Sequence, residues 1–153
     1  MSGAALTLDR LAPRTPQQRL PEAVPGEPGL LIVDATWGEI QPLRLARGVE
    51  TVGELEVIEH VLAGGLLVDT RRPEYLAAGT LPTAIAIHHE EIVARRAELG
   101  DGPVVLFCNG PQCRATPWAI ERLLDAGHPA ELLRYYRGGI HDWVTLGLPL
   151  QAG

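Results

Sequence analysis

Residues 104–118 read VVLFCNGPQCRATPW, and the fold class can be worked out from this stretch. The apolar run 104–107 lies between two Gly-Pro breaks, which is typical of a short buried strand. A helix is predicted to follow, with Thr116 as its N-cap, Pro117 at its first position and Gly127 at its end. Cys108 therefore follows the carboxyl end of a strand and faces the N-terminus of a helix.

This position favours a reactive thiolate at Cys108. Free N–H groups and the positive end of the helix dipole meet there, and such sites lower a cysteine pKa from about 8.5 to roughly 3.5–7.5. Arg114 adds a planar cation that suits an oxyanion. A cysteine at a strand end is more often a small buried hydrophobe, but its combination with a loop, an arginine and a helix start favours reactivity. The predicted substrate-binding loop consists of Asn109, Gly110, Pro111, Gln112 and Cys113, with Gly110 expected at positive φ.

Composition narrows the function classes. The 153 residues are 46% apolar and 21% charged, which fits one globular domain with a tail. A net charge of −6 argues against nucleic-acid binding, and no apolar run is long enough to span a membrane. No secretory signal is recognised, and two cysteines in one loop fit a reducing, cytoplasmic compartment. No metal or other cofactor is expected, because the five histidines show no metal-ligand spacing.

The chain divides into an N-terminal extension, residues 1–48, and a domain over residues 49–150. The extension contains a proline-rich arm and possible short strands, at Leu30–Val33 and at Trp37–Leu45, which could pair with each other. In the domain, strands alternate with helices, which indicates an α/β fold with a mainly parallel sheet.

The first predicted helix of the domain opens at a capping-box pattern, Thr51-Val-Gly-Glu54, and runs to about Leu62. Its expected buried face carries Leu55, Ile58, Val61 and Leu62. The other predicted elements are strands at 66–69, 104–107 and 130–135, an apolar stretch at 83–87, and helices at 72–79, 90–99, 116–127 and 140–146.

Three stretches of this domain, which together cover about two thirds of the chain, resemble the rhodanese family. Asp69–Ile85 is similar to the family's Asp-x-Arg…Glu-Tyr…Gly-His-Ile-Pro-Gly-Ala segment. Val104–Cys108 and the loop after it resemble the active-site strand and cysteine. Tyr136–Pro149 resembles the closing Gly-Gly-x-x-x-Trp…Gly-x-Pro segment. Each stretch alone is a weak signal, whereas all three in this order are a specific one.

The resemblance implies a rhodanese-like fold, a five-stranded mainly parallel sheet flanked by helices on both faces. It also implies sulfur transfer, in which Cys108 takes sulfane sulfur from a small anionic donor such as thiosulfate and becomes a persulfide. The sulfur then passes to cyanide, a thiol or a protein acceptor. Cys108 and Arg114 would be catalytic. Asp69 and Arg71, at the end of the neighbouring strand, are expected to support the loop through an ion pair, and Trp118 to line its mouth.

The chain departs from the family pattern in ways that keep other functions open. Arg114 lies six residues after Cys108 rather than five, and a Cys-x5-Arg loop resembles rhodanese-related phosphatases and arsenate reductases. Those enzymes usually have His before the cysteine and Ser or Thr after the arginine, where this chain has Phe107 and Ala115. A non-catalytic, protein-binding rhodanese module is the third alternative.

Three further positions differ from the family. Thr80 and Thr83 stand where His and Gly are common. Cys113 is a second thiol inside the loop, and two interpretations of it remain open. It could be a resolving thiol that closes a disulfide with Cys108, or a small side chain that fills space beneath the loop.

Overall fold

The structure is a computed structural model that describes residues 22–28, 31–32 and 40–152. Its centre is a five-stranded sheet in the order β3-β7-β6-β4-β5, in which every pair of neighbouring strands is parallel. The strands are β3 (Glu50–Thr51), β4 (Leu66–Asp69), β5 (Ile85–Ala86), β6 (Val104–Phe107) and β7 (Leu133–Tyr136). The predicted parallel α/β fold is confirmed.

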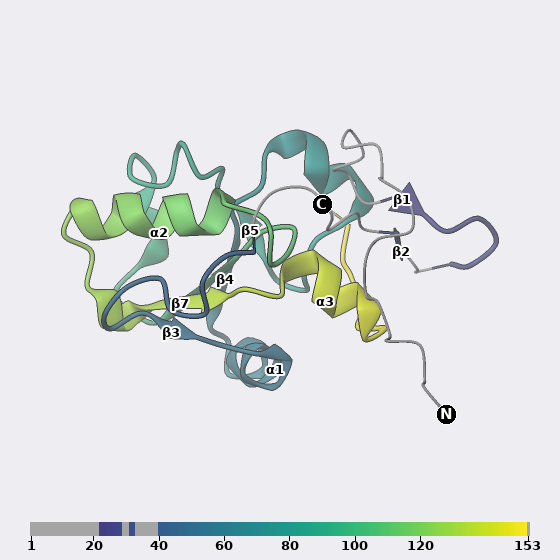
Figure 1. Cartoon of the computed structure of the whole chain (residues 1–153), viewed down its shortest axis with the longest axis horizontal. Coiled ribbons are helices and arrows are strands. Elements are labelled where there is room, and N and C mark those ends of the chain that lie inside the picture. The colour runs from purple at the N-terminus through teal and green to yellow at the C-terminus, as the bar shows by residue number, and fades with distance from the viewer. Residues whose placement is uncertain (1–21, 29–30, 33–39, 153) are drawn as a thin grey trace, which may run out of the picture.

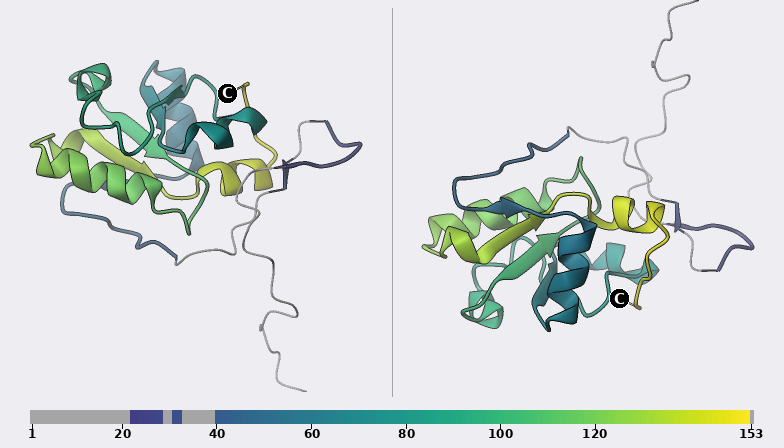
Figure 2. Two further views of the ribbon diagram at one scale, coloured as in Figure 1. Left: turned by 90° about the horizontal axis from the view of Figure 1, so that it is seen from above. Right: turned by 90° about the horizontal axis from the view of Figure 1, so that it is seen from below.

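Helices cover both faces of this sheet (Figures 1 and 2). Helix α2 (Ala115–Asp125) covers one face, and α1 (Glu54–Leu62) covers the other, with α3 (Gly139–Thr145) packed into the same core as α1. Three short 3-10 helices complete the main fold, namely η1 (Pro73–Ala78), η2 (Arg96–Leu99) and η3 (Ala130–Leu132). No helix within the described residues is long and apolar enough to cross a membrane.

The surroundings of β6 explain why residues 104–107 are all apolar rather than alternately apolar and polar. Val104 and Leu106 enter the core beneath α2, whereas Val105 and Phe107 enter the core beneath α1 and α3. Because both faces of a central parallel strand are covered, every side chain on it must be apolar. The strand therefore delivers Cys108 to the carboxyl edge of the sheet from a rigid, fully buried element.

The start and part of the buried face of α1 were predicted wrongly. The helix begins at Glu54 after Gly53, whose N–H is bonded by the Glu56 carboxylate, rather than at a cap on Thr51. Val57 and His60 are its buried residues, while Leu55 and Leu62 are 76% and 81% exposed. The other two residues of the expected face, Ile58 and Val61, are partly buried and pack against the core, so only Leu55 and Leu62 were placed wrongly.

The predicted helix at 90–99 is also wrong, because turns lead there into the single 3-10 segment η2. Only two apolar side chains of this segment are buried, Ile92 and Leu99. Arg95 holds the turns instead, through ion pairs with Glu91 and Glu98 and a hydrogen bond to the Ala86 carbonyl.

Smaller differences concern element boundaries. Helix α2 begins at Ala115 with Arg114 at the N-cap, so Thr116 lies in the first turn rather than at the cap. The strand expected at 130–135 is η3 followed by β7. The strands at 66–69 and 104–107 are confirmed, β5 lies within 83–87, η1 lies within 72–79, and α3 is shifted by one residue from 140–146.

The predicted extension is described only in part. Strand β2 (Leu31–Ile32) lies within the expected strand at 30–33, but it pairs antiparallel with β1 (Glu22–Ala23) in a sheet of its own. Residues 40–45 form no strand, and residues 37–39 lie outside the described residues. Since β3 begins at Glu50, the main sheet starts close to the predicted boundary at residue 49, and the division itself remains a prediction.

Candidate active site

The site lies where β4 and β6 end side by side. Asp69 pairs with Phe107 in the register of these two strands, so the residues that follow each strand meet at one edge of the sheet. In open α/β sheets, ligands bind at this carboxyl edge. Cys108 is the first residue after β6, and it is 2% exposed.

The loop after Cys108 folds back on itself. Cys113 N–H donates to the Gly110 carbonyl at 3.0 Å, which closes a turn with Pro111 at the second position, where proline is favoured. The Cys108 Sγ lies 3.6 Å from the Cys113 carbonyl oxygen, and its single hydrogen can be donated either to this oxygen or to the Cys113 sulfur. The turn therefore returns the second cysteine to the first.

The first turn of α3 holds the loop from behind. Ile140 N–H donates to the Cys108 carbonyl at 3.1 Å, and His141 N–H donates to the Asn109 carbonyl at 2.7 Å. Gly139 makes this approach possible, with φ +59°, since an added Cβ would lie 2.3 Å from the Cys108 carbonyl oxygen. The closing Gly-Gly motif is thus part of the active-site wall.

The expectation of positive φ at Gly110 is wrong, and of the two glycines of the closing motif only Gly139 has positive φ. At Gly110 the constraint is space, because a Cβ there would lie 2.9 Å from the His141 Cβ. Gly138 has φ −60°, and a Cβ would lie 2.6 Å from the Asp142 carboxylate.

The predicted ion pair between Asp69 and Arg71 is present and buried. The Arg71 guanidinium lies 2.7 Å from the Asp69 carboxylate, and the two side chains are 1% and 0% exposed. Arg71 also donates to the Gly79 carbonyl at 2.7 Å and to the Asn109 side-chain oxygen at 3.3 Å. Thr80 donates its hydroxyl to Asp69 at 2.7 Å. The pair therefore joins η1, β4 and the active-site loop in one network.

The two thiols form a hydrogen-bonded pair, and their pKa values shift in opposite directions. Burial raises the pKa of Cys108, and the neighbouring Cys113 raises it further. The hydrogen bond from Cys108 lowers the pKa of Cys113, with the N–H groups of Ala115 and Asn109 and the Arg71 charge adding to the effect. These shifts favour the anion at Cys113 over the anion at Cys108, whereas the thiolate was expected at Cys108. The backbone N–H groups of Ala115 and Asn109 hydrogen-bond to the Cys113 sulfur, whereas only that of Thr116 hydrogen-bonds to the Cys108 sulfur.

Cys108 still has donors aimed at it. The Thr116 N–H and hydroxyl both hydrogen-bond to the Cys108 sulfur and favour its anion. The Thr70 hydroxyl lies 2.8 Å from the Thr116 hydroxyl and 3.0 Å from the Phe107 carbonyl, and when it donates to Thr116 the single Thr116 hydrogen is left for Cys108. Sequence reasoning missed both threonine roles. The signal for Thr116 was its position in the first helical turn, whereas nothing in the sequence pointed to Thr70.

A third group missed by sequence reasoning lies deeper. The Tyr135 hydroxyl is buried and has no hydrogen-bond partner among the described residues. Burial raises its pKa, and the charges of Cys108 and Cys113 raise it further. The tyrosine therefore lies within electrostatic range of both thiols.

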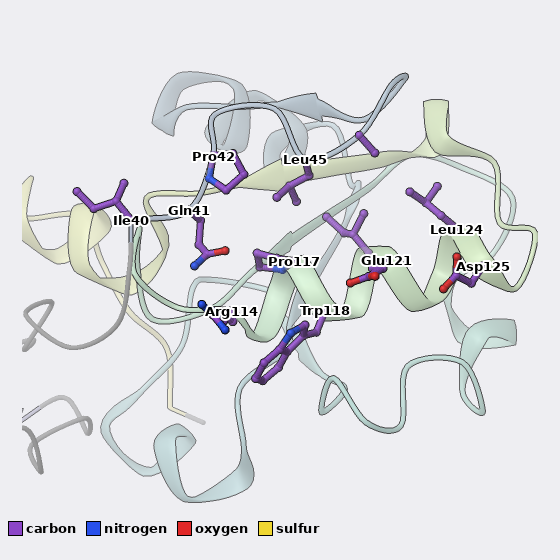
Figure 3. Close-up of a pocket in the computed structure, with 12 residues that line it drawn as sticks. Ile40, Gln41, Pro42, Leu45, Arg114, Pro117, Trp118, Glu121, Leu124 and Asp125 are labelled. Carbon is purple, nitrogen blue, oxygen red and sulfur yellow. The ribbon is translucent and has the colours of Figure 1, made fainter.

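Arg114 and Trp118 lie outside this buried cluster, along a groove of about 540 Å³ (Figure 3). One wall is the segment 40–46 and the other is the exposed side of α2. Arg114 is exposed at the loop end of the groove, and Trp118 is 41% exposed. Glu121 and Asp125 place carboxylates farther along the helix.

The segment 40–46 is tied directly to the loop. Gln41 N–H donates to the Pro111 carbonyl at 2.7 Å, and the Gln41 carbonyl accepts a hydrogen bond from Arg137 at 2.8 Å. Next to Pro111, the Gln112 side-chain oxygen is buried without a hydrogen-bond partner among the described residues. Sequence reasoning missed Gln41, because it precedes every motif.

One cluster within the described residues has the composition of a metal site. Donor atoms of His88, His89 and Glu90 lie within 4.8 Å of one another. However, the Arg122 guanidinium lies 2.8 Å from His89 Nδ1 and competes there with a cation. Burial and the neighbouring cations lower the pKa of His89 to about 4. This cluster supports no metal assignment.

Comparison with known proteins identifies the family. A match to the family described as "Rhodanese-like domain" covers residues 55–146, well over half of the chain. The chain belongs to this family. The matched region of the rhodanese-like domain includes Asp69, Cys108 and the loop between β6 and α2.

One curated relative resembles this rhodanese-like domain in sequence. The HTH-type transcriptional regulator Rv0324 of Mycobacterium tuberculosis is 35% identical over 106 residues, which are 68% of this chain and 46% of the regulator. The chain therefore spans about half the length of that curated relative.

Two solved structures are similar in fold. One is a thiosulfate sulfurtransferase from Pseudomonas aeruginosa, with a TM-score of 0.58 and 27% identity over 70% of this chain and 21% of that chain. The other is the human single-domain sulfurtransferase TSTD1, with a TM-score of 0.52 and 25% identity over 63% of this chain and 96% of that chain. The rhodanese-like domain thus has sulfurtransferases among its structural neighbours.

Proposed function

We propose that this chain is a sulfurtransferase that carries sulfane sulfur as a persulfide on Cys108. The observation that supports it best is the position of Cys108, between the end of β6 and the first turn of α2, where Thr116 offers two hydrogen bonds to the sulfur. Membership of the rhodanese-like family gives this position its chemical meaning. The donor is a small sulfur anion such as thiosulfate, and the acceptor is cyanide, a thiol or a protein thiol.

The thiol pair supplies the nucleophile. The pKa of Cys108 is raised and that of its hydrogen-bond partner Cys113 is lowered, so a Cys113 thiolate can take the Cys108 proton and produce the Cys108 thiolate without an external base. The thiolate attacks the sulfane sulfur of thiosulfate, the sulfur–sulfur bond breaks, and sulfite leaves with the bonding electrons. The Thr116 donors then stabilise the persulfide anion.

In this proposal the groove beside the loop binds the part of the acceptor molecule that carries its reacting thiol. Trp118 offers an apolar face, Arg114 a cation near the loop, and Glu121 and Asp125 anions farther along. A thiol with a carboxylate near its sulfur and an ammonium group farther away matches this order of charges. In this proposal Arg114 binds substrate, and Asp69 and Arg71 position the loop through Asn109.

We also propose a compartment and a domain division for this protein. Free thiols with a catalytic role belong in a reducing compartment, which for this chain is the cytoplasm. Residues 1–48 are an extension of the catalytic unit formed by residues 49–150.

Intact-mass measurement tests the function. Cys113→Ser incubated anaerobically with thiosulfate is expected to gain the mass of one sulfur atom, whereas Cys108→Ser is expected to gain none. Absence of added sulfur on Cys113→Ser, together with absence of sulfite release from the wild type, would contradict the proposal. Release of phosphate from an aryl phosphate by the wild type would favour the phosphatase alternative. Slow alkylation of Cys108 at every pH, with no turnover of either substrate, would favour the binding module.

A further inference from the structure

The second thiol of the loop is unexplained by sulfur transfer alone. A persulfide on Cys108 needs one sulfur nucleophile from outside, yet the loop already contains another, in hydrogen-bond contact with the first. Both cysteines are free thiols, and they are 2% and 5% exposed. Each is therefore better placed to react with the other than with a large reagent from solvent.

The fold holds this contact in place from both sides. The turn closed by Cys113 N–H and the Gly110 carbonyl directs Cys113 back toward β6. The N-terminus of α3 fixes the carbonyls of Cys108 and Asn109. Because the loop is anchored at both positions, the approach of the two sulfurs does not depend on a chance fluctuation.

The surroundings of Cys113 suit an attacking thiolate. Its sulfur accepts hydrogen bonds from the N–H groups of Asn109 and Ala115, and Arg71 adds a buried positive charge nearby. These are the conditions that stabilise a thiolate. Their effect on the pKa of Cys113 is downward, in agreement with this arrangement.

We propose that Cys113 discharges the Cys108 persulfide within the loop and releases the outer sulfur as hydrosulfide. The inference rests on the proposed function, because it needs the Cys108 persulfide as its substrate. It adds an activity, the reduction of sulfane sulfur to sulfide, and it assigns the role of resolving thiol to Cys113.

The step balances in atoms and electrons. Cys113 Sγ forms a bond to Cys108 Sγ, and the bond between Cys108 Sγ and the outer sulfur breaks. The outer sulfur leaves with that electron pair, and with the proton that the Cys113 thiol gives up as it attacks, it departs as hydrosulfide. Two cysteine sulfurs are thereby oxidised to a disulfide, while one sulfane sulfur is reduced to sulfide.

Turnover then depends on a dithiol reductant from solution, which restores the two thiols. Without such a reductant each chain releases one hydrosulfide and stops. An external acceptor competes for the same persulfide, so the loop divides sulfur between transfer and release according to acceptor concentration.

The test compares wild type, Cys113→Ser and Cys108→Ser, each reduced, freed of reductant and given thiosulfate without dioxygen. Wild type is expected to release one hydrosulfide per chain and to end as an intramolecular disulfide, two hydrogens lighter than the reduced protein. Cys113→Ser is expected to keep the persulfide, with sulfide release at least tenfold slower. Cys108→Ser is expected to do neither. Reduced wild type kept without thiosulfate serves as the control for adventitious oxidation.

The outcomes separate the two proposals. A wild type that keeps a stable persulfide, with no sulfide and no disulfide, would overturn the role of Cys113 and leave sulfur transfer intact. Failure of the wild type to release sulfite, together with failure of Cys113→Ser to gain sulfur, would overturn the sulfurtransferase proposal itself. If Cys113→Ser unfolds, Cys113→Ala in the same assay gives the equivalent comparison.

Discussion

The buried ion pair beneath the loop should dominate the response of this fold to mutation. Asp69→Asn keeps the side-chain shape but removes the charge that faces Arg71, and both side chains are shielded from water. The Asn amide group would also point hydrogens at the donors of Thr80 or Arg71. Removal of one partner of a buried pair costs about 3–5 kcal/mol of unfolding free energy, because the other charge stays buried and unpaired.

The chain contains its own control for this magnitude. Arg95 and Glu98 form an ion pair at 2.6 Å, shorter than the buried pair, but with side chains 37% and 46% exposed. Exposed pairs contribute about 0–1 kcal/mol, so Glu98→Gln should change the unfolding free energy by no more than that. Distance alone would predict the opposite ranking.

Equilibrium unfolding in urea, monitored by tryptophan fluorescence, measures both variants. Because domains of this size are stable by about 5–15 kcal/mol, Asp69→Asn could leave too little folded protein to measure. Thr80→Val then supplies a milder step, since it removes only the hydroxyl bound to Asp69 and should cost about 1–3 kcal/mol. A loss below 1 kcal/mol for Asp69→Asn would refute the reasoning.

Four further predictions follow from the site and its surroundings. Thr116→Val should lower sulfur loading at neutral pH by about 10–100-fold and move its pH profile to higher pH, because a hydrogen bond to the Cys108 anion worth about 1.5–3 kcal/mol is lost; an unmoved profile would count against this. Trp118→Ala should raise KM for thiol acceptors about tenfold but leave the steady-state rate with cyanide unchanged, and equal effects on both acceptors would exclude the groove as the carrier site. Thr83→Gly should raise the unfolding free energy by roughly 0.5–1 kcal/mol, measured as a higher urea midpoint, since Thr83 has φ +66°. Stability should fall as pH drops from 6.5 to about 4, because the unfolded chain protonates His89 while the folded chain does not; His89→Gln should flatten this slope.

Much of the fold was predictable because its signals are local. A fully apolar run between Gly-Pro breaks is sufficient to indicate a buried strand, and β6 is one. The segment 90–99 was not predictable in the same way, since its conformation depends on Arg95 reaching Ala86 and two glutamates. Such contacts are invisible to helical periodicity.

The candidate site, like the fold, was predictable where its features are local in the sequence. The sequence places Cys108, Cys113 and the Asp69–Arg71 pair near one edge of the sheet, because strand ends and motif spacing are local properties. Which sulfur is charged depends on how amides and burial are shared between the two, and this emerges only from the folded loop. The usual family glycine at position 83 also gains a physical reason, because the backbone there is left-handed.

The contact between Gly139 and the back of the loop has a consequence for biosynthesis. Ribosomes make a protein from its N-terminus, so both cysteines emerge before the residues that hold the carbonyls of Cys108 and Asn109. Until residues 139–141 dock, the nascent chain presents two ordinary, unshielded thiols to cellular oxidants. Protection of the dithiol, as well as its reactivity, is therefore acquired late in synthesis, when the segment that follows β7 folds.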